Sequence, residues 1–196
     1  MNRYTVITGP VGFPVTLEEV KADLKITSTA SDSVLEDLIA VATDELEAYT
    51  RRYFIEREML GEYDSINSTK LERYPFAKIE RSPLKNIDSV QVSRSNVFVD
   101  QTYQLKDQST FARILFNDGI SCLDDIPFPL KISFFAGYGD ADAVPVRIKS
   151  AIRRLVVYLF QNPGYCDDGC TAENLPGDVR MLIASFRIVD GFGVHS

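Results

Sequence analysis

The sequence is poor in the residues on which most enzymatic and metal chemistry depends. It contains one histidine (His195), three cysteines and no tryptophan in 196 residues. A Ser–His–Asp triad or a Cys–His pair would have to use His195, one residue from the end of the sequence, and neither a G-x-S-x-G nor a G-x-x-x-x-G-K-[ST] motif occurs. These absences predict a protein that is not an enzyme.

The cysteines do not form a zinc-binding pattern. Cys166 and Cys170 are four residues apart, and Cys122 is distant from both in the sequence. A structural zinc site needs four Cys or His ligands in close pairs, so we expect no metal and no cofactor. The cysteines are interpreted as free thiols, the alternative being a local Cys166–Cys170 disulfide in an oxidising compartment.

Long hydrophobic runs and positive net charge are also missing. No apolar stretch approaches the roughly 20 residues that span a bilayer, and the N-terminus lacks the apolar core of a signal peptide. We therefore expect a soluble protein made in the cytoplasm. The net charge of −7 argues against nonspecific nucleic-acid binding, which requires a basic surface.

Helical patterns occupy the two ends of the sequence. Thr16 and Glu19 form a capping box before a short helix, and apolar residues recur every three or four positions over Asp32–Arg52. The same spacing returns over Pro145–Gln161, and a last helix is predicted from Pro176.

Strand patterns occupy the middle of the sequence, whereas the segment before Thr16 is expected to be extended and irregular. Short runs rich in Val, Ile, Phe and Tyr are separated by turn signals, including an Asp118-Gly119 hairpin. The predicted strands are Ile87–Val92, Tyr103–Leu105, Ala112–Phe116 and Leu130–Phe135. We predict an α+β fold with a helical bundle from residues 1–53 and 139–196, into which a mostly antiparallel β-subdomain, 54–138, is inserted.

Gly137-Tyr138-Gly139-Asp140 joins the last predicted strand to the Pro145 helix. It matches the start of a G-x-G-x-x-G dinucleotide motif, but Asp142 stands where the third glycine would be and no βαβ pattern surrounds it. Glycine permits positive φ where a chain turns sharply. The segment is therefore predicted to be a structural hinge.

The two long helices differ in charge. The Asp32–Arg52 helix is acidic on its predicted outer face, which carries Asp32, Glu36, Asp37, Asp44, Glu45 and Glu47. The helix after Pro145 carries Arg147, Lys149, Arg153 and Arg154 and no acid up to Phe160. These surfaces could meet within one subunit or between subunits, or the basic face could simply be solvated.

Four segments follow one another in a recognisable order. They are PVTLEEVKADLKI (14–26), DSVLEDLIAVATDELEAYTRRYF (32–54), Ser82-Pro83-Leu84 and FFAGYGDADAVPVRIKSAIRRLVVYLFQN (134–162). Together they resemble the phage head–tail connector (adaptor) family, in the longer form with a β-insertion, although Phe135 stands where tyrosine or threonine is common in that family. The matching residues determine the fold and carry no chemistry.

The resemblance implies a structural virion protein of the neck, at the head–tail interface. Such proteins form a ring, commonly of twelve subunits, beneath the portal, where they extend the DNA channel and dock stopper or tail proteins. DNA is expected to pass without specific binding. The alternative is another neck or tail-completion (stopper) component.

Ring-building contacts are predicted on the polar faces of the two long helices. The subunit-interface candidates are Glu36, Asp37, Glu45, Arg147, Arg153 and Arg154. Phe192 is the candidate apolar anchor of a C-terminal arm that could order on a portal, the alternative being a frayed end.

Overall fold

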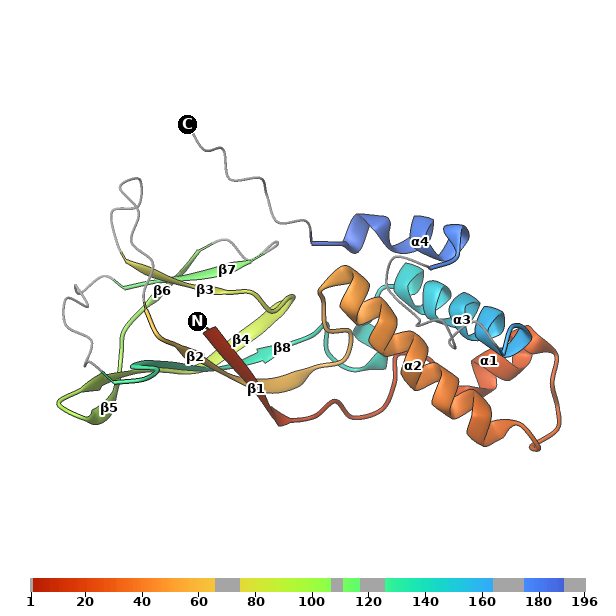
Figure 1. The fold of residues 1–196 in the computed structure, drawn as a ribbon, viewed down its shortest axis with the longest axis horizontal. Coiled ribbons are helices and arrows are strands. Elements are labelled where there is room, and N and C mark those ends of the chain that lie inside the picture. Colours follow the sequence, from red (N-terminus) through yellow and green to blue (C-terminus); the bar gives the residue numbers. More distant parts are fainter. Residues whose placement is uncertain (1, 66–74, 107–110, 117–125, 164–174, 189–196) are drawn as a thin grey trace. The chain divides into compact units, whose positions relative to one another are not determined.

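The computed structural model describes residues 2–65, 75–106, 111–116, 126–163 and 175–188. The predicted Asp118-Gly119 hairpin, all three cysteines, Phe192 and His195 lie outside these ranges. The chain divides into two compact units (Figure 1). One comprises Met1–Val11 and Ile55–Tyr138, and the other comprises Gly12–Phe54 and Gly139–Ser196.

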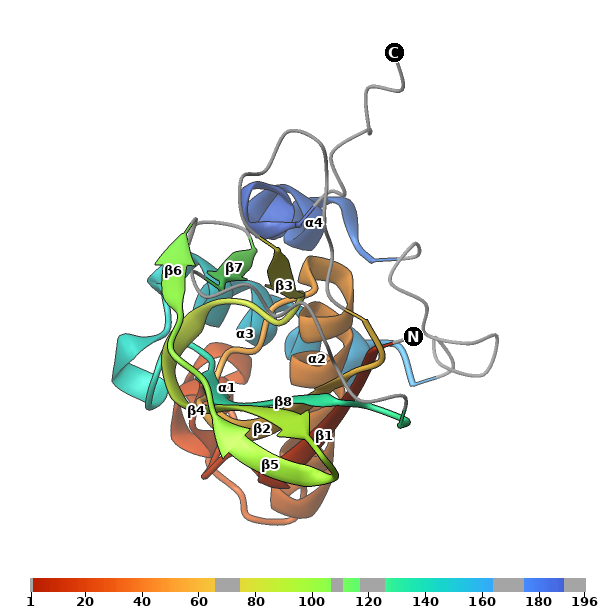
Figure 2. The same ribbon diagram turned by 90° about the vertical axis from the view of Figure 1, so that its left-hand side faces the viewer.

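The first unit is made of strands in two antiparallel sheets. The larger sheet has the order β1-β2-β8-β4-β5, and its strands are β1 (Asn2–Thr8), β2 (Arg57–Tyr63), β8 (Leu130–Ala136), β4 (Leu84–Arg94) and β5 (Val97–Asp100). The smaller sheet has the order β3-β7-β6, with β3 (Phe76–Ile79), β7 (Ala112–Leu115) and β6 (Gln104–Lys106). Both views place the smaller sheet over one face of the larger one (Figures 1 and 2).

Alternation of side chains along β8 explains how the larger sheet builds its core. Leu130, Ile132, Phe134 and Ala136 are buried, and the residues between them are half-buried. Period-2 burial is the expected result when one sheet face is covered. Tyr4 on β1 helps to join the two sheets, because its hydroxyl donates to the Lys78 carbonyl on β3 at 3.3 Å.

The second unit is helical, and α3 lies at its centre. The helices are α1 (Leu17–Leu24), α2 (Asp32–Thr50), α3 (Val146–Gln161) and α4 (Gly177–Ile183). Helix α3 packs against each of the other helices, and its buried side chains are Ile148, Ala151, Ile152, Leu155, Val156 and Leu159. A short 3-10 turn, Ala184–Phe186, follows α4. Beyond it, the Ile188 N–H donates to the Thr50 carbonyl at 3.0 Å, which fastens this segment to the end of α2.

The α+β prediction is confirmed, as are the helices and the antiparallel pairing of the strands that were expected. The Thr16–Glu19 capping box is present, with the Thr16 N–H bonded to the Glu19 carboxylate at 2.8 Å. The expectation of an extended, irregular segment before Thr16 holds for residues 9–15, which form neither helix nor strand, but not for the residues before them. Residues 2–8 form β1, because they find a partner in β2, which the sequence patterns did not reveal.

The predicted division into a helical domain (1–53 and 139–196) and an inserted β-subdomain (54–138) stays a prediction. The observed strand unit also includes the first eleven residues, Met1–Val11, since β1 pairs with β2 there.

Gly137 lies where β8 ends, and its conformation supports the predicted hinge. Its φ is +127°, and that of Gly139 is +132°, both in a region that favours glycine. A Cβ atom on Gly137 would lie 2.6 Å from the Ile55 carbonyl oxygen and from the Glu56 Cα atom. The close approach of the Ile55–Glu56 backbone, rather than a ligand, therefore explains why residue 137 is glycine.

Candidate functional site

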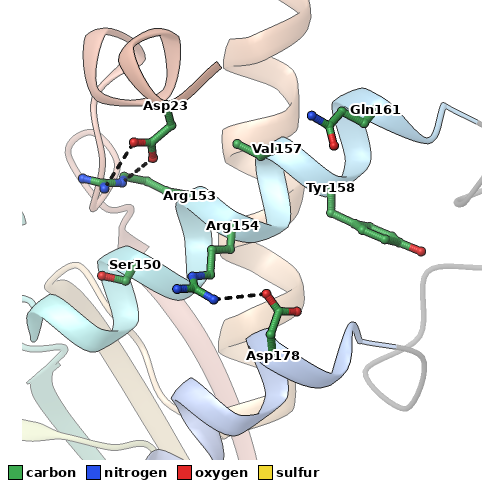
Figure 3. Close-up of a pocket in the computed structure, with 8 residues that line it drawn as sticks. All are labelled: Asp23, Ser150, Arg153, Arg154, Val157, Tyr158, Gln161 and Asp178. Atoms are coloured by element: carbon green, nitrogen blue, oxygen red, sulfur yellow. Dashed lines mark hydrogen bonds and ion pairs between the residues drawn. The ribbon is translucent and has the colours of Figure 1, made fainter. Parts of the chain in front are cut away.

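Helix α3 is tied to helices on both of its flanks by consecutive arginines. The Arg153 Nε atom lies 2.8 Å from Asp23 Oδ2 on α1, and an Nη2–Oδ1 contact of 3.4 Å completes a two-point pairing (Figure 3). On the opposite flank, Arg154 Nη1 lies 3.2 Å from Asp178 Oδ2 on α4 (Figure 3). Adjacent residues on a helix point about 100° apart, so the two arginines reach different neighbours.

A groove of about 550 Å³ follows α3 between these two ion pairs. Asp23 stands on one side and Asp178 on the other, and α3 supplies the remaining lining residues: Ser150, Arg153, Arg154, Val157, Tyr158 and Gln161 (Figure 3). The charges of the arginines and aspartates that line the groove balance. A neutral, mixed lining of this kind suits a protein surface better than a charged small molecule.

Basic residues also stand in the first turn of α3, where the helix dipole disfavours them. Arg147 is exposed and Lys149 is half-buried, and the first turn holds no acid. Neither side chain forms an ion pair with any described residue. A cation at a helix N-terminus costs about 0.3–1 kcal/mol.

The predicted interface acids lie on α2 and carry the opposite charge. Glu36, Asp37 and Asp44 are exposed and Glu45 is half-buried, and none of them pairs with a cation in the described parts of the chain. Asp44 and Glu45 lie in the last two turns, toward the negative end of the helix dipole, and the last turn has no basic residue. Partial burial, together with the neighbouring Asp44 charge, raises the pKa of Glu45.

Two other acids of the predicted outer face have structural roles. Glu47 is buried, not exposed, and its Oε1 atom accepts a hydrogen bond from the Phe54 N–H at 2.6 Å. Asp32 pairs with Lys21 on α1 at 2.6 Å. The expectation that Glu47 faces solvent was wrong, because periodicity alone does not show what packs beside a helix flank; Asp32 remains partly exposed.

The structure thus places the predicted site residues in two groups. Arg153 and Arg154 pair within the chain, with aspartates from α1 and α4. Arg147 and the acids of α2 are not brought together in the described chain. Sequence reasoning missed Asp23 and Asp178, which are far from α3 in the sequence and carry no motif. The interface roles of all these residues stay predictions.

The strand unit contains a pair of buried tyrosines with perturbed pKa values. The Tyr4 and Tyr63 hydroxyls are 3.2 Å apart, and burial raises the pKa of both groups above the usual tyrosine range. Arg81 lies over the Tyr4 ring, 4.8 Å from its centre. Neutral, mutually bonded hydroxyls of this kind stabilise a core and are poorly suited to proton transfer.

The described ranges contain no group of three or more His, Cys, Asp or Glu side chains placed to hold a metal ion. None of the helices in these ranges is both long and apolar enough to cross a membrane.

Sequence comparison assigns the family. The phage gp6-like head-tail connector proteins match residues 14–115, which is more than half of the chain. The chain belongs to this family. A search among curated proteins found no match.

Solved structures share the fold along almost the whole chain. A chain from the neck of an empty gene transfer agent (GTA) particle, computed with C6 symmetry, has a TM-score of 0.73 and 18% identity, covering 97% of this chain and 98% of that one. A chain from the virion of a native GTA particle has a TM-score of 0.71 and 19% identity, with 97% coverage of both. One from the neck of a native GTA particle computed with C12 symmetry has a TM-score of 0.69 and 20% identity, covering 97% and 98%.

Proposed function

We propose that this protein is a structural head–tail adaptor that forms a ring of twelve subunits in the neck of a phage-like particle. The observation that carries the proposal is membership of the connector family together with a fold shared over 97% of the chain with a protein from a C12 neck. The residues that match the family determine structure, and a neck component with this role performs no catalysis.

The proposed partners are further copies of the chain, the portal protein above the ring and a stopper or tail protein below it. Double-stranded DNA would pass through the ring. The net charge of −7 favours passage over binding, because phosphates are held by basic surfaces. The protein would be made in the host cytoplasm and reside in the virion neck.

The ring would be built by heterologous contacts, in which one face of a subunit meets a different face of its neighbour. We assign these contacts to the helical unit, with Glu36, Asp37, Glu45, Arg147, Arg153 and Arg154 as candidates. Arg153 and Arg154 would act through their ion pairs, which shape the groove on α3. Phe192 remains the proposed anchor of a C-terminal arm on the portal.

The test is to produce the chain together with the portal and stopper proteins of its own particle and to image the purified complex by electron microscopy. We expect a ring of this chain, twelve-fold symmetric, directly beneath the portal. Density for the chain on the tail side, with another protein against the portal, would instead identify a stopper. Failure to join the complex would overturn the proposal.

A further inference from the structure

Two surfaces of the helical unit carry charges that the fold itself does not use. The first is the start of α3, where Arg147 and Lys149 stand against the helix dipole without an ion-pair partner among the described residues. The second is the outer side of α2, where Asp37 and Asp44 are exposed and equally unpaired in the described chain. The first arrangement weakens the isolated subunit and the second leaves like charges in solvent, so a contact outside the subunit is the simplest reason for both.

Exposed apolar side chains accompany the charges on both surfaces. Val146, beside Arg147, is 76% exposed. Val34 and Val41 on α2 are 50% and 38% exposed. Val34, Asp37, Val41 and Asp44 follow one another at spacings of three and four, which aligns them on one side of the helix. We call these residues the acidic ridge, and Val146, Arg147 and Lys149 the cationic turn.

We propose that the cationic turn of one subunit docks on the acidic ridge of a second copy of the same chain. The proposal deepens the proposed function and rests on it, because it names the contact that would join neighbours in the ring. Opposite charges would flank an apolar centre in which Val146 packs against Val34 and Val41. Complementary charge of this kind selects the partner and sets its register.

The geometry within one chain favours a contact between copies. Helices α2 and α3 pack against each other through their buried sides, which include Ile39, Leu46, Ile152 and Leu155. The exposed side chains of the ridge and of the turn therefore lie outside this shared core, on two different helices. Two different, mutually complementary surfaces on one chain are what a head-to-tail ring requires.

The test is a charge swap in the full-length protein. Arg147→Glu with Lys149→Glu reverses the turn, and Asp37→Lys with Asp44→Lys reverses the ridge. Either pair makes like charges meet, and we expect the dissociation constant between subunits to rise about 100-fold. The chain carrying all four changes should assemble again, since opposite charges then meet with their signs exchanged.

Native mass spectrometry of the free protein and electron microscopy of the portal complex would report assembly. Thermal unfolding of the monomer serves as the folding check. Reversal of the turn should leave the melting temperature unchanged or raise it, because acids suit the start of a helix. Reversal of the ridge should change it little, because Asp37 and Asp44 are exposed and lie outside the first and last turns of α2. Lys25→Glu with Arg180→Glu is the matched control for the reversed turn, with the same change of net charge at exposed sites outside both surfaces.

Restored assembly in the fourfold variant, with normal assembly of the control, would support the proposal. Rings that form normally in either reversed variant, or a fourfold variant that stays monomeric, would overturn this contact while leaving the proposed ring intact. A wild-type chain that forms no ring, alone or with the portal, would overturn the proposed function and this inference together.

Discussion

At the scale of the residue, the carboxylate of Glu47 shows how an acid can be essential to the fold without facing solvent. Its side chain is only 8% exposed although it lies in the last turn of an acidic helix. The 2.6 Å hydrogen bond from the Phe54 N–H fixes the path of the chain just after α2 ends. A buried backbone donor needs such a partner, because leaving it unmade costs the full desolvation of the group.

Replacing Glu47 by alanine should therefore lower the free energy of unfolding by about 1–3 kcal/mol, the cost of an unsatisfied buried donor. Glu36→Ala, an exposed change on the same helix, should alter it by less than about 0.5 kcal/mol. Urea unfolding followed by circular dichroism would measure both. Equal, small changes in the two variants would show that the Phe54 amide finds another acceptor.

At the scale of the element, the β4–β5 hairpin turns through two residues in the left-handed region. Ser95 and Asn96 have φ values of +54° and +62°, and Arg94 pairs directly with Val97. Two consecutive positive φ angles in a two-residue loop define a type I′ turn, for which Asn-Gly is the preferred sequence.

Ser95→Asn combined with Asn96→Gly should thus raise the free energy of unfolding by about 0.5–1 kcal/mol, since left-handed strain on two side chains is relieved. Asn96→Ala should lower it by a similar amount. Thermal unfolding of the three proteins in parallel would test the order. An alanine variant as stable as the Asn-Gly variant would contradict the turn type.

The elements also show how far the sequence could predict the fold. The long helices were predicted to within two residues, because α2 and α3 each bury one side and their apolar residues repeat accordingly. Strands β1, β2, β3 and β5 were not predicted. Strand β1 is exposed along most of its length, so its sequence carries little alternation. Pairing with β2, some fifty residues away, decides its structure.

The site was predicted only in part for a similar reason. The charge of α3 is evident in the sequence, since its cations lie on one continuous helix. The partners of these cations are not evident in the sequence. Asp23 and Asp178 belong to other helices, and nothing in the sequence distinguishes them from other surface acids. The groove between the two ion pairs forms only when α1 and α4 pack beside the basic helix α3.

At the scale of the whole molecule, the unpaired charges predict opposite effects of salt on folding and on assembly. The net charge is −7, and the acids of α2 repel one another in the monomer. Screening with added salt should therefore leave monomer stability unchanged or slightly raised. Association between subunits should weaken, because the attraction between the cationic turn and the acidic ridge is screened.

Raising sodium chloride from about 0.05 M to about 0.5 M shortens the screening length well below 10 Å, and we expect about a tenfold weaker association. Sedimentation velocity and thermal unfolding at matched salt concentrations would measure the two effects. Association that strengthens with salt would point to an apolar contact as the dominant one.

The paired arginines of α3 have a mechanical consequence. Arg153 holds α1 on one flank and Arg154 holds α4 on the other, about 100° around the same helix. Rotation of α3 about its long axis would lengthen one of these two ion pairs in either direction, so the pairs oppose that rotation. Each exposed pair adds little stability, and the buried side chains of α3 hold the helix in place; the two pairs add a restraint on its rotation. The proposed ring, which must close after a fixed number of copies, requires the same orientation of α3 in every copy.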